Sequence, residues 1–170
     1  MKGYQKILFL VSATEREASI VNTYESSIDG SNSASNLVDG KGLNGNIFEG
    51  FCSHTRITSD EVNHWFSLEL AVPEKISRVQ IVPRLDCCYY RAKNIHISIG
   101  PSQSYDPNEP LCLPEIPQLV MEEGLTDYKC TQLQHKGKFV KISRKGDALN
   151  LCEVKIFTLT DDTTTDKVEL

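Results

Sequence analysis

In the stretch His64–Leu70, which reads HWFSLEL, every second residue is apolar, and its two faces divide into Phe66, Leu68 and Leu70 against Trp65, Ser67 and Glu69. This period of two is typical of a half-buried β-strand. The stretch Asn94–Ile99 repeats the pattern, with isoleucine at every second position. Because the alternation places Trp65 on a sheet face next to Phe66, we expect Trp65 to be a packing residue of the strand.

Further short segments rich in Val, Ile and Phe are bounded by Gly, Pro, Asp or Asn, and they predict strands at Ile7–Val11, Ile76–Val82, Phe139–Ile142 and Leu149–Phe157. No clear helical periodicity competes with them. Several short strands of this kind predict an all-β sandwich or barrel. Long polar connections follow at Ser26–Asn46, Thr55–Asn63 and Pro101–Pro117. Binding residues on a rigid sheet tend to lie in such loops, so we expect the function there.

The chain of 170 residues fits a single domain, which we assign to residues 1–160, followed by a polar, Thr-rich tail at 161–170. The net charge of -5 provides no broad basic surface, so we expect no nucleic-acid partner. No apolar run approaches the roughly 20 residues that would cross a bilayer, so we expect no membrane insertion. The composition is that of a soluble globular protein.

The six cysteines form no Cys-x-x-Cys pair, which disfavours a structural zinc site. Disulfides are the better interpretation, and they indicate an extracellular protein. The residues alone do not choose among the possible pairings. No signal peptide is evident, since the apolar run Ile7–Val11 is short and is read as a strand. A secreted form would therefore either have lost its signal already or leave the cell by another route.

Motifs of catalysis are missing from the chain. It contains no phosphate-binding glycine loop, no Gly-x-Ser-x-Gly elbow and no His-Glu-x-x-His helix. We therefore expect that the protein is not an enzyme.

The most unusual segment is Arg84–Arg91, which reads RLDCCYYR. It places Asp86 between two arginines, next to an adjacent cysteine pair. The ordinary interpretation is a solvated ion pair between Arg84 and Asp86, with each cysteine bonded elsewhere, because neighbouring Cα atoms lie only about 3.8 Å apart, below the usual disulfide range.

Five further motifs before and after this segment help to interpret it. They are NLVDG at 36–40, GFCSHT at 50–55, HWFSLEL at 64–70, GKFV at 137–140 and LCEV at 151–154. In this order, with the rare Asp-Cys-Cys, the chain from about Ala34 to Phe157 resembles the F-type lectin, or fucolectin, family. The resemblance implies a jelly-roll β-sandwich of the discoidin kind. It also implies a lectin that binds L-fucose on fucosylated glycans through loops at one end, without catalysis.

The resemblance also implies which residues bind the sugar. The family's motif falls on His54, Arg84, Asp86 and Arg91, with a vicinal disulfide between Cys87 and Cys88 and an aromatic seat for the sugar methyl group at Phe48. Charged arginine donors suit neutral sugar oxygens, and the planar fork grips two at once. We expect Asp86 to orient Arg84, and His54 to donate from one ring nitrogen.

Two structural features follow from the same resemblance. The remaining disulfides are Cys52 with Cys152 and Cys112 with Cys130. A structural Ca²⁺ ion, the one cofactor expected, falls on Asn36, Asp39, Lys41, Phe51, Cys152 and Glu153. Calcium takes six to eight oxygen ligands, which carboxylates and backbone carbonyls supply.

The segment Glu17–Ser33 departs from the family and is expected to be a loop that reshapes one wall of the pocket. The loop after His54 is longer than usual, which keeps open a discoidin-type adhesion or protein-binding module with a degenerate sugar site. An accessory carbohydrate-binding domain of a larger protein would have the same sequence. A single shallow site binds weakly, in the range of about 10 μM to 1 mM, so we expect a homo-oligomer or tandem array.

Overall fold

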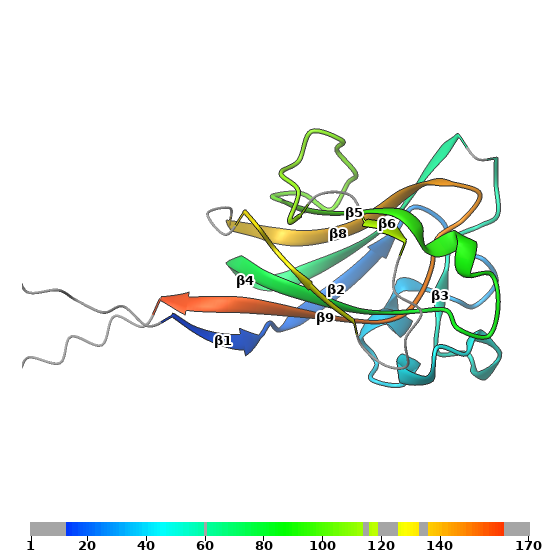
Figure 1. Cartoon of the computed structure of the whole chain (residues 1–170), viewed down its shortest axis with the longest axis horizontal. Helices are drawn as coiled ribbons and strands as arrows, with labels where there is room; N and C mark the ends of the chain where they lie inside the picture. Colours follow the sequence, from blue (N-terminus) through cyan, green and yellow to red (C-terminus); the bar gives the residue numbers. More distant parts are fainter. Residues whose placement is uncertain (1–12, 60, 114–115, 119–125, 133–135, 162–170) are drawn as a thin grey trace, which may run out of the picture.

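The computed structural model describes residues 13–59, 61–113, 116–118, 126–132 and 136–161. Within these residues the chain forms antiparallel strands joined by short 3-10 turns (Figure 1). The strands are β1 Ala13–Glu17, β2 Ile20–Glu25, β3 Ser53–His54, β4 Val62–Pro83, β5 Lys93–Gly100, β6 Ile116–Gln118, β7 Thr126–Lys129, β8 Lys136–Gly146 and β9 Asn150–Asp161. The turns are η1 Ala34–Val38, η2 Gly42–Asn44, η3 Ile47–Glu49 and η4 Tyr89–Ala92. None of these turns is long and apolar enough to span a membrane.

Strand β4 belongs to both layers of the sandwich. Its first half pairs with β2 and β8, and β8 pairs with β5; its second half pairs with β9 and β7, and β9 pairs with β1. The sheet therefore curls into two layers through one continuous strand (Figure 1). The prediction of separate strands at His64–Leu70 and Ile76–Val82 was wrong at this point. The exposed linker between them stays extended because the backbone N–H of Ala71 donates to Ser19 O at 3.0 Å.

The core lies between these two layers. Phe66, Leu68 and Leu70 are fully buried, and the isoleucines of β5 face the same interior, as their alternation predicts. Val154 and Ile156 of β9 contribute from the opposite layer. Burying one such side chain contributes about 1.5–3 kcal/mol, so this interdigitation is the main source of stability. The predicted all-β sandwich is confirmed.

The first two strands were not predicted. The segment Glu17–Ser33, expected to be a loop, contains β2, which pairs with β4 from Ile20 to Glu25. The side chains of β1 are all exposed, because it is an edge strand on β9, so it has no apolar alternation to detect. Its pairing of Ala13 with Asp161 brings the two ends of the described chain together. The predicted strand Ile7–Val11 and residues 162–170 of the predicted tail lie outside the described residues.

Three disulfides join the six cysteines in the pairs that the family resemblance implies: Cys52–Cys152, Cys87–Cys88 and Cys112–Cys130. The first ties the segment before β3 to β9, across a sequence separation of 100 residues. The third joins the segment after β5 to the end of β7.

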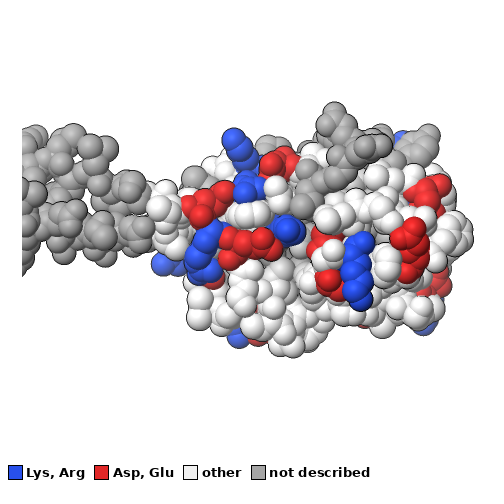
Figure 2. Space-filling model, turned by 90° about the horizontal axis from the view of Figure 1, so that it is seen from below, with Lys and Arg blue, Asp and Glu red and all other residues white. Residues whose placement is uncertain are grey.

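Charged side chains of both signs alternate on the face seen in Figure 2. Among the described ion pairs, Arg78 contacts Glu15 at 2.8 Å and Asp127 at 2.5 Å, and Arg16 contacts Glu74 at 2.5 Å. These positive groups are therefore paired with carboxylates.

Candidate functional site

Strand β3, the end of β4 and turn η4 bring His54, Arg84 and Arg91 together at one end of the sandwich. His54 lies in β3, whose pairing with Asn150 of β9 fixes its backbone. Arg84 directly follows β4. Arg91 lies in η4, and its backbone N–H donates to Cys88 O at 3.0 Å. His54 thus meets arginines that lie 30 and 37 positions further along the chain, because two strand ends and one turn lie at the same edge.

His54 is 3% exposed, and both of its ring nitrogens are engaged. Nδ1 contacts the carbonyl oxygen of Thr55, which only accepts, and Nε2 lies 3.0 Å from Nη1 of Arg91, which only donates. Nδ1 must therefore carry the proton and Nε2 must accept. Burial lowers the pKa of His54, and the charges of Arg91 and Arg84 lower it further, which keeps the ring neutral. As expected, one ring nitrogen of His54 donates, here to Thr55 O, while the other accepts from Arg91 and so helps to hold it.

Arg91 is also held by a carboxylate that the sequence reasoning missed. Its Nε donates to Oδ2 of Asp147 at 3.0 Å, and the other oxygen of Asp147 accepts from Nη1 of Arg144 at 3.2 Å. Burial acts to raise the pKa of Asp147, but the hydrogen bonds and charges of the two arginines bring it below its usual value. Asp147 lies in the turn between β8 and β9, where no local pattern connects it with Arg91.

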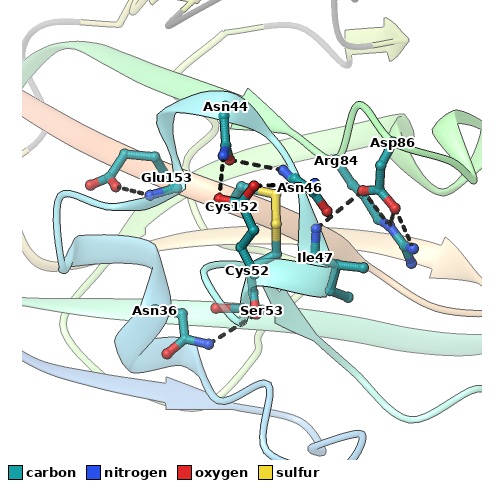
Figure 3. Close-up of a disulfide and its surroundings, with 12 residues drawn as sticks. Asn36, Asn44, Asn46, Ile47, Cys52, Ser53, Arg84, Asp86, Cys152 and Glu153 are labelled. Atoms are coloured by element: carbon teal, nitrogen blue, oxygen red, sulfur yellow. Dashed lines mark hydrogen bonds and ion pairs between the residues drawn. A yellow bond between two sulfur atoms is a disulfide. The ribbon is translucent and has the colours of Figure 1, made fainter.

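Arg84 is fixed by a bidentate contact with Asp86. Its Nε donates to Oδ1 at 3.0 Å and its Nη2 to Oδ2 at 2.7 Å, and Oδ1 of Asp86 also accepts from the backbone N–H of Ile47 at 3.1 Å (Figure 3). The hydrogen bond from Arg84 lowers the pKa of Asp86. This is the geometry expected of an orienting carboxylate. Among the described residues, none accepts a hydrogen bond from Nη1 of Arg84 or Nη2 of Arg91.

Apolar surface lies next to these donors. Phe48 of η3 is 84% exposed, and the guanidinium carbon of Arg84 lies 5.6 Å from its ring centroid. The hydrogen bond from Ile47 to Asp86 ties η3 to the same edge. The Cys87–Cys88 disulfide follows Asp86 directly, and Cys88 has a left-handed backbone (φ 60°) that begins η4. The site therefore combines two oriented guanidinium groups with an aromatic ring and a disulfide.

Of the residues predicted to bind calcium, Asn36 and Glu153 lie near the Cys52–Cys152 disulfide, and Cys152 is part of it (Figure 3). Glu153 is 2% exposed, and its carboxylate accepts from the backbone N–H of Gly42 at 3.2 Å. Burial and the charge of Asp39 raise the pKa of Glu153. A Cβ on Gly42 would lie 1.7 Å from Cys152 O and 2.8 Å from Phe51 O, so these two carbonyl oxygens converge on the same point.

This donor set suits a hard cation that prefers oxygen, since a buried carboxylate and converging carbonyls would gain a counter-charge. In the described part of the chain, no group of three or more His, Cys, Asp or Glu side chains is placed so that it could hold a metal ion, so backbone oxygens would have to supply much of the coordination. The amide nitrogen of Asn36 donates to Gly50 O and Cys52 O, which leaves only its oxygens for a metal. Lys41 directs its ammonium towards the ring of Phe51, 5.8 Å from the centroid.

The longer loop after His54 is anchored to the β8–β9 turn. The backbone N–H of Thr55 donates to Leu149 O at 3.1 Å, and that of Thr58 donates to Asp147 O at 2.8 Å. The extra residues therefore leave the contact between His54 and Arg91 in place.

Comparisons with known proteins agree with this architecture. The family model F5/F8 type C, described as a NedA-like, galactose-binding domain, matches residues 26–112. Over 128 residues, the chain is 34% identical to fucolectin-4 of Anguilla japonica, covering 74% of this chain and 67% of that protein. It is 30% identical over 135 residues to a pentraxin fusion protein of Xenopus laevis, covering 79% of this chain but only 31% of that protein.

Two solved structures are similar in fold and in sequence. A fucolectin from the serum of Morone saxatilis superposes with a TM-score of 0.69 at 26% identity, covering 83% of this chain and 46% of that one. A fucose binding module of Streptococcus pneumoniae, SpX-3, gives a TM-score of 0.62 at 28% identity, covering 81% of this chain and 93% of that one. The chain thus corresponds to about a third of the frog protein and under half of the bass lectin.

Proposed function

The chain belongs to the F-type lectin, or fucolectin, family of discoidin-like domains, and on that premise we propose that it binds L-fucose on fucosylated glycans. Members of this family are lectins and carbohydrate-binding modules rather than enzymes, in agreement with the absence of catalytic motifs. The observation that carries the proposal is the pair of guanidinium groups at one edge of the sandwich. Arg84 and Arg91 are each oriented by a carboxylate, and each keeps one nitrogen without a partner among the described residues.

These groups match the polar side of a sugar. Hydroxyl and ring oxygens are neutral acceptors, and a charged donor makes a stronger hydrogen bond with them than a neutral donor does. The donors are held before binding by Asp86, Asp147 and His54, so little side-chain entropy is lost when the ligand arrives. In this proposal Arg84 and Arg91 contact the sugar, and the other three residues position them.

The apolar surface next to Arg84 matches the methyl group of a deoxy sugar. Phe48, 84% exposed, and the Cys87–Cys88 disulfide would cover that methyl group. Burying one methyl group contributes about 0.8 kcal/mol, which favours L-fucose over a sugar that carries a hydroxymethyl group there.

We also propose a structural calcium ion held by the carboxylates of Asp39 and Glu153 with the carbonyl oxygens of Phe51 and Cys152. The buried, raised-pKa carboxylate of Glu153 supports this assignment, since a bound cation would stabilise its ionised form. When bound, the ion would hold the turns η1 and η2 against β9.

The three disulfides and the fucolectin relatives support an extracellular location for this protein. A single shallow site is expected to bind weakly, so useful avidity requires several copies in an oligomer or tandem array. A tandem array is consistent with the relatives, since the frog protein and the bass lectin are much longer than the region that this chain matches.

The test is calorimetry with L-fucose, with D-galactose as the control sugar. We expect saturable binding of L-fucose with a Kd of about 10 μM to 1 mM. The Arg84→Ala variant should lose binding by at least tenfold, whereas Arg16→Ala, which breaks an ion pair on the surface of β1, should bind normally. A folded wild-type protein that binds neither sugar at tens of millimolar would contradict the proposal and favour an adhesion module that binds protein.

A further inference from the structure

A cavity lies on the outer face of the sheet formed by β2, β4, β8 and β5. Phe66 of β4 points into the core, so its neighbour Trp65 points outwards, where it is half-buried. The cavity has a volume of about 540 Å³. Its lining includes Tyr24, Glu25, Ile28, Arg56, Trp65 and Gln103. An aromatic floor with a few polar side chains around it is typical of a small-ligand site.

Hydrogen bonds hold the backbone around this cavity, whereas two of its polar side chains have no acceptor among the described residues. The backbone of Trp65 exchanges two hydrogen bonds with Ser26, at 3.0 and 3.1 Å, and the backbone N–H of Arg56 donates to Ser27 Oγ at 3.0 Å. Among the described residues, however, none accepts a hydrogen bond from the indole N–H of Trp65 or from the guanidinium of Arg56. Within the part of the chain that the structure describes, these donors are thus available to a ligand without the loss of an internal contact.

The loop that carries Gln103 is anchored to the same sheet face. Farther along this loop, Glu109 contacts the ammonium of Lys141 at 2.5 and 2.7 Å and accepts from Ser98 Oγ at 3.2 Å. Lys141 is fully buried. Because a buried charge that loses its partner is strongly unfavourable, this ion pair holds the loop against the sheet and fixes that side of the cavity.

The cavity adjoins the proposed fucose site through the segment Ser27–Asp29. Ser27 and Ile28 line the cavity, while the backbone N–H of Asp29 donates to His54 O at 2.9 Å and its carboxylate lies 3.7 Å from Nδ1 of the same histidine. Arg56 follows His54 by two residues, a span of at most about 7 Å. A ligand seated near Arg84 and Arg91 can therefore extend over this wall.

The chemistry of the lining selects the class of ligand. One positive group, Arg56, and one negative group, Glu25, leave the cavity close to neutral, which disfavours a phosphate or another strong anion. The faces of Trp65 and Tyr24 suit the C–H face of a pyranose, and the free donors suit its hydroxyl groups. The hydroxyl of Tyr24 is already bound to Glu69 at 2.8 Å, so its ring is held in place.

We propose that this cavity is a subsite for a second sugar of the same glycan, with Trp65 as its stacking platform and Arg56 as its principal donor. The inference rests on the proposed function, since it is the fucose that brings the rest of the glycan to the wall at Ser27–Asp29. It assigns to the chain a preference for fucosylated oligosaccharides over free fucose.

The single tryptophan of the chain makes this proposal directly testable. Two isomeric fucosyllactoses, in which fucose is attached to the galactose or to the glucose of lactose, are compared with L-fucose by calorimetry and by tryptophan fluorescence. At least one isomer should bind about tenfold more tightly than fucose and change the emission of Trp65. Fucose alone should bind without changing the emission, because it stays on the other side of the wall.

The variants Arg56→Ala and Trp65→Phe should lower the affinity for that isomer towards the affinity for fucose, while the affinity for fucose itself stays within about twofold. Arg16→Ala serves as the matched control. If fucose binds but neither isomer binds more tightly, or if both variants keep the gain, the second subsite is refuted and the fucose site stands. If wild type binds neither fucose nor fucosyllactose, both proposals fail.

Discussion

Replacing Asp147 by Asn tests whether the orientation of Arg91 is set at a distance. Asp147 lies between Arg91 and Arg144, which are 9% and 8% exposed. One of its carboxylate oxygens accepts a hydrogen bond from Arg91, and the other accepts one from Arg144. A hydrogen bond to a charged group contributes about 1.5–3 kcal/mol, and Asn retains one neutral acceptor. We therefore expect the free energy of unfolding to fall by about 1–2 kcal/mol, with two buried guanidinium groups left facing an amide.

The effect on sugar binding is separable from this loss of stability. In this variant Arg91 loses its charged partner and, among the described residues, keeps the contact with His54 and at most a neutral amide acceptor at position 147, so a donor in the proposed sugar site is less firmly oriented. The affinity for L-fucose should fall about tenfold, which corresponds to about 1.4 kcal/mol. Calorimetry at 25 °C, where the variant stays folded, measures this directly, and thermal unfolding measures the stability.

Two controls accompany the change. Asp127→Asn removes a comparable carboxylate from Arg78 at the surface of β7 and should leave fucose affinity unchanged. Arg144→Met breaks the other contact of Asp147 and should lower stability without a comparable loss of affinity.

Because the pKa of Asp147 is lowered in the folded state, its contribution to stability should be complete above the ordinary aspartate pKa of about 3.9 and should disappear as the pH falls through the lower folded value. A folded Asp147→Asn protein with wild-type affinity would refute the positioning role.

Three further predictions concern the metal, the buried ion pair and a disulfide. Removal of calcium by a chelator should lower the Tm, and an unchanged Tm would argue against the site. In the chelated protein, the free energy of unfolding should fall as the pH rises from the ordinary Glu pKa through the raised pKa of Glu153. Excess calcium should abolish this pH dependence. Lys141→Ala should lower the free energy of unfolding, measured by chemical denaturation, by about 3–5 kcal/mol, because Glu109 is left buried without its counter-charge. The double change Lys141→Met with Glu109→Leu should recover most of this loss. Equal losses in the single and the double variant would contradict this account. Replacing both Cys52 and Cys152 by Ala should lower the free energy of unfolding by about 2–5 kcal/mol, since their bond closes a loop of 100 residues, and a loss below about 1 kcal/mol would show that the unfolded chain is little constrained by it.

The strands that the sequence predicts are those with a buried face. Ile95, Ile97 and Ile99 alternate because the core is on one side of β5, and the period of two survives in the sequence. Strand β1 has no buried face, so Ala13–Glu17 has no such pattern, and only its pairing with β9 reveals it. The joining of two predicted strands into β4 likewise depends on a long-range partner, since Ala71 is held by Ser19.

In the site, too, contacts between residues close in the sequence could be predicted, whereas contacts between distant residues could not. Arg84 and Asp86 are close in sequence, so their contact could be proposed from a local motif. Asp147 is 56 residues from Arg91, in a hairpin turn, and nothing in its neighbours marks it as a partner. The cavity at Trp65 arises from segments 24–28, 56, 65 and 103, which only the folded sheet brings together. The alternation predicted that Trp65 lies on a sheet face, but it could not predict what covers that face.

The pairing of Ala13 with Asp161 has a consequence for how this domain can be joined to others. The outer ends of β1 and β9 lie side by side at one pole of the sandwich, whereas β3 and the 3-10 turns lie at the opposite pole (Figure 1). Adjacent entry and exit points mean that such a unit can be inserted into another polypeptide, or strung with copies of itself, with little loop-closure entropy. In every such arrangement the attachment would lie away from Arg84 and Arg91, so each copy in the string would keep its sugar-binding end free for a crowded glycan surface.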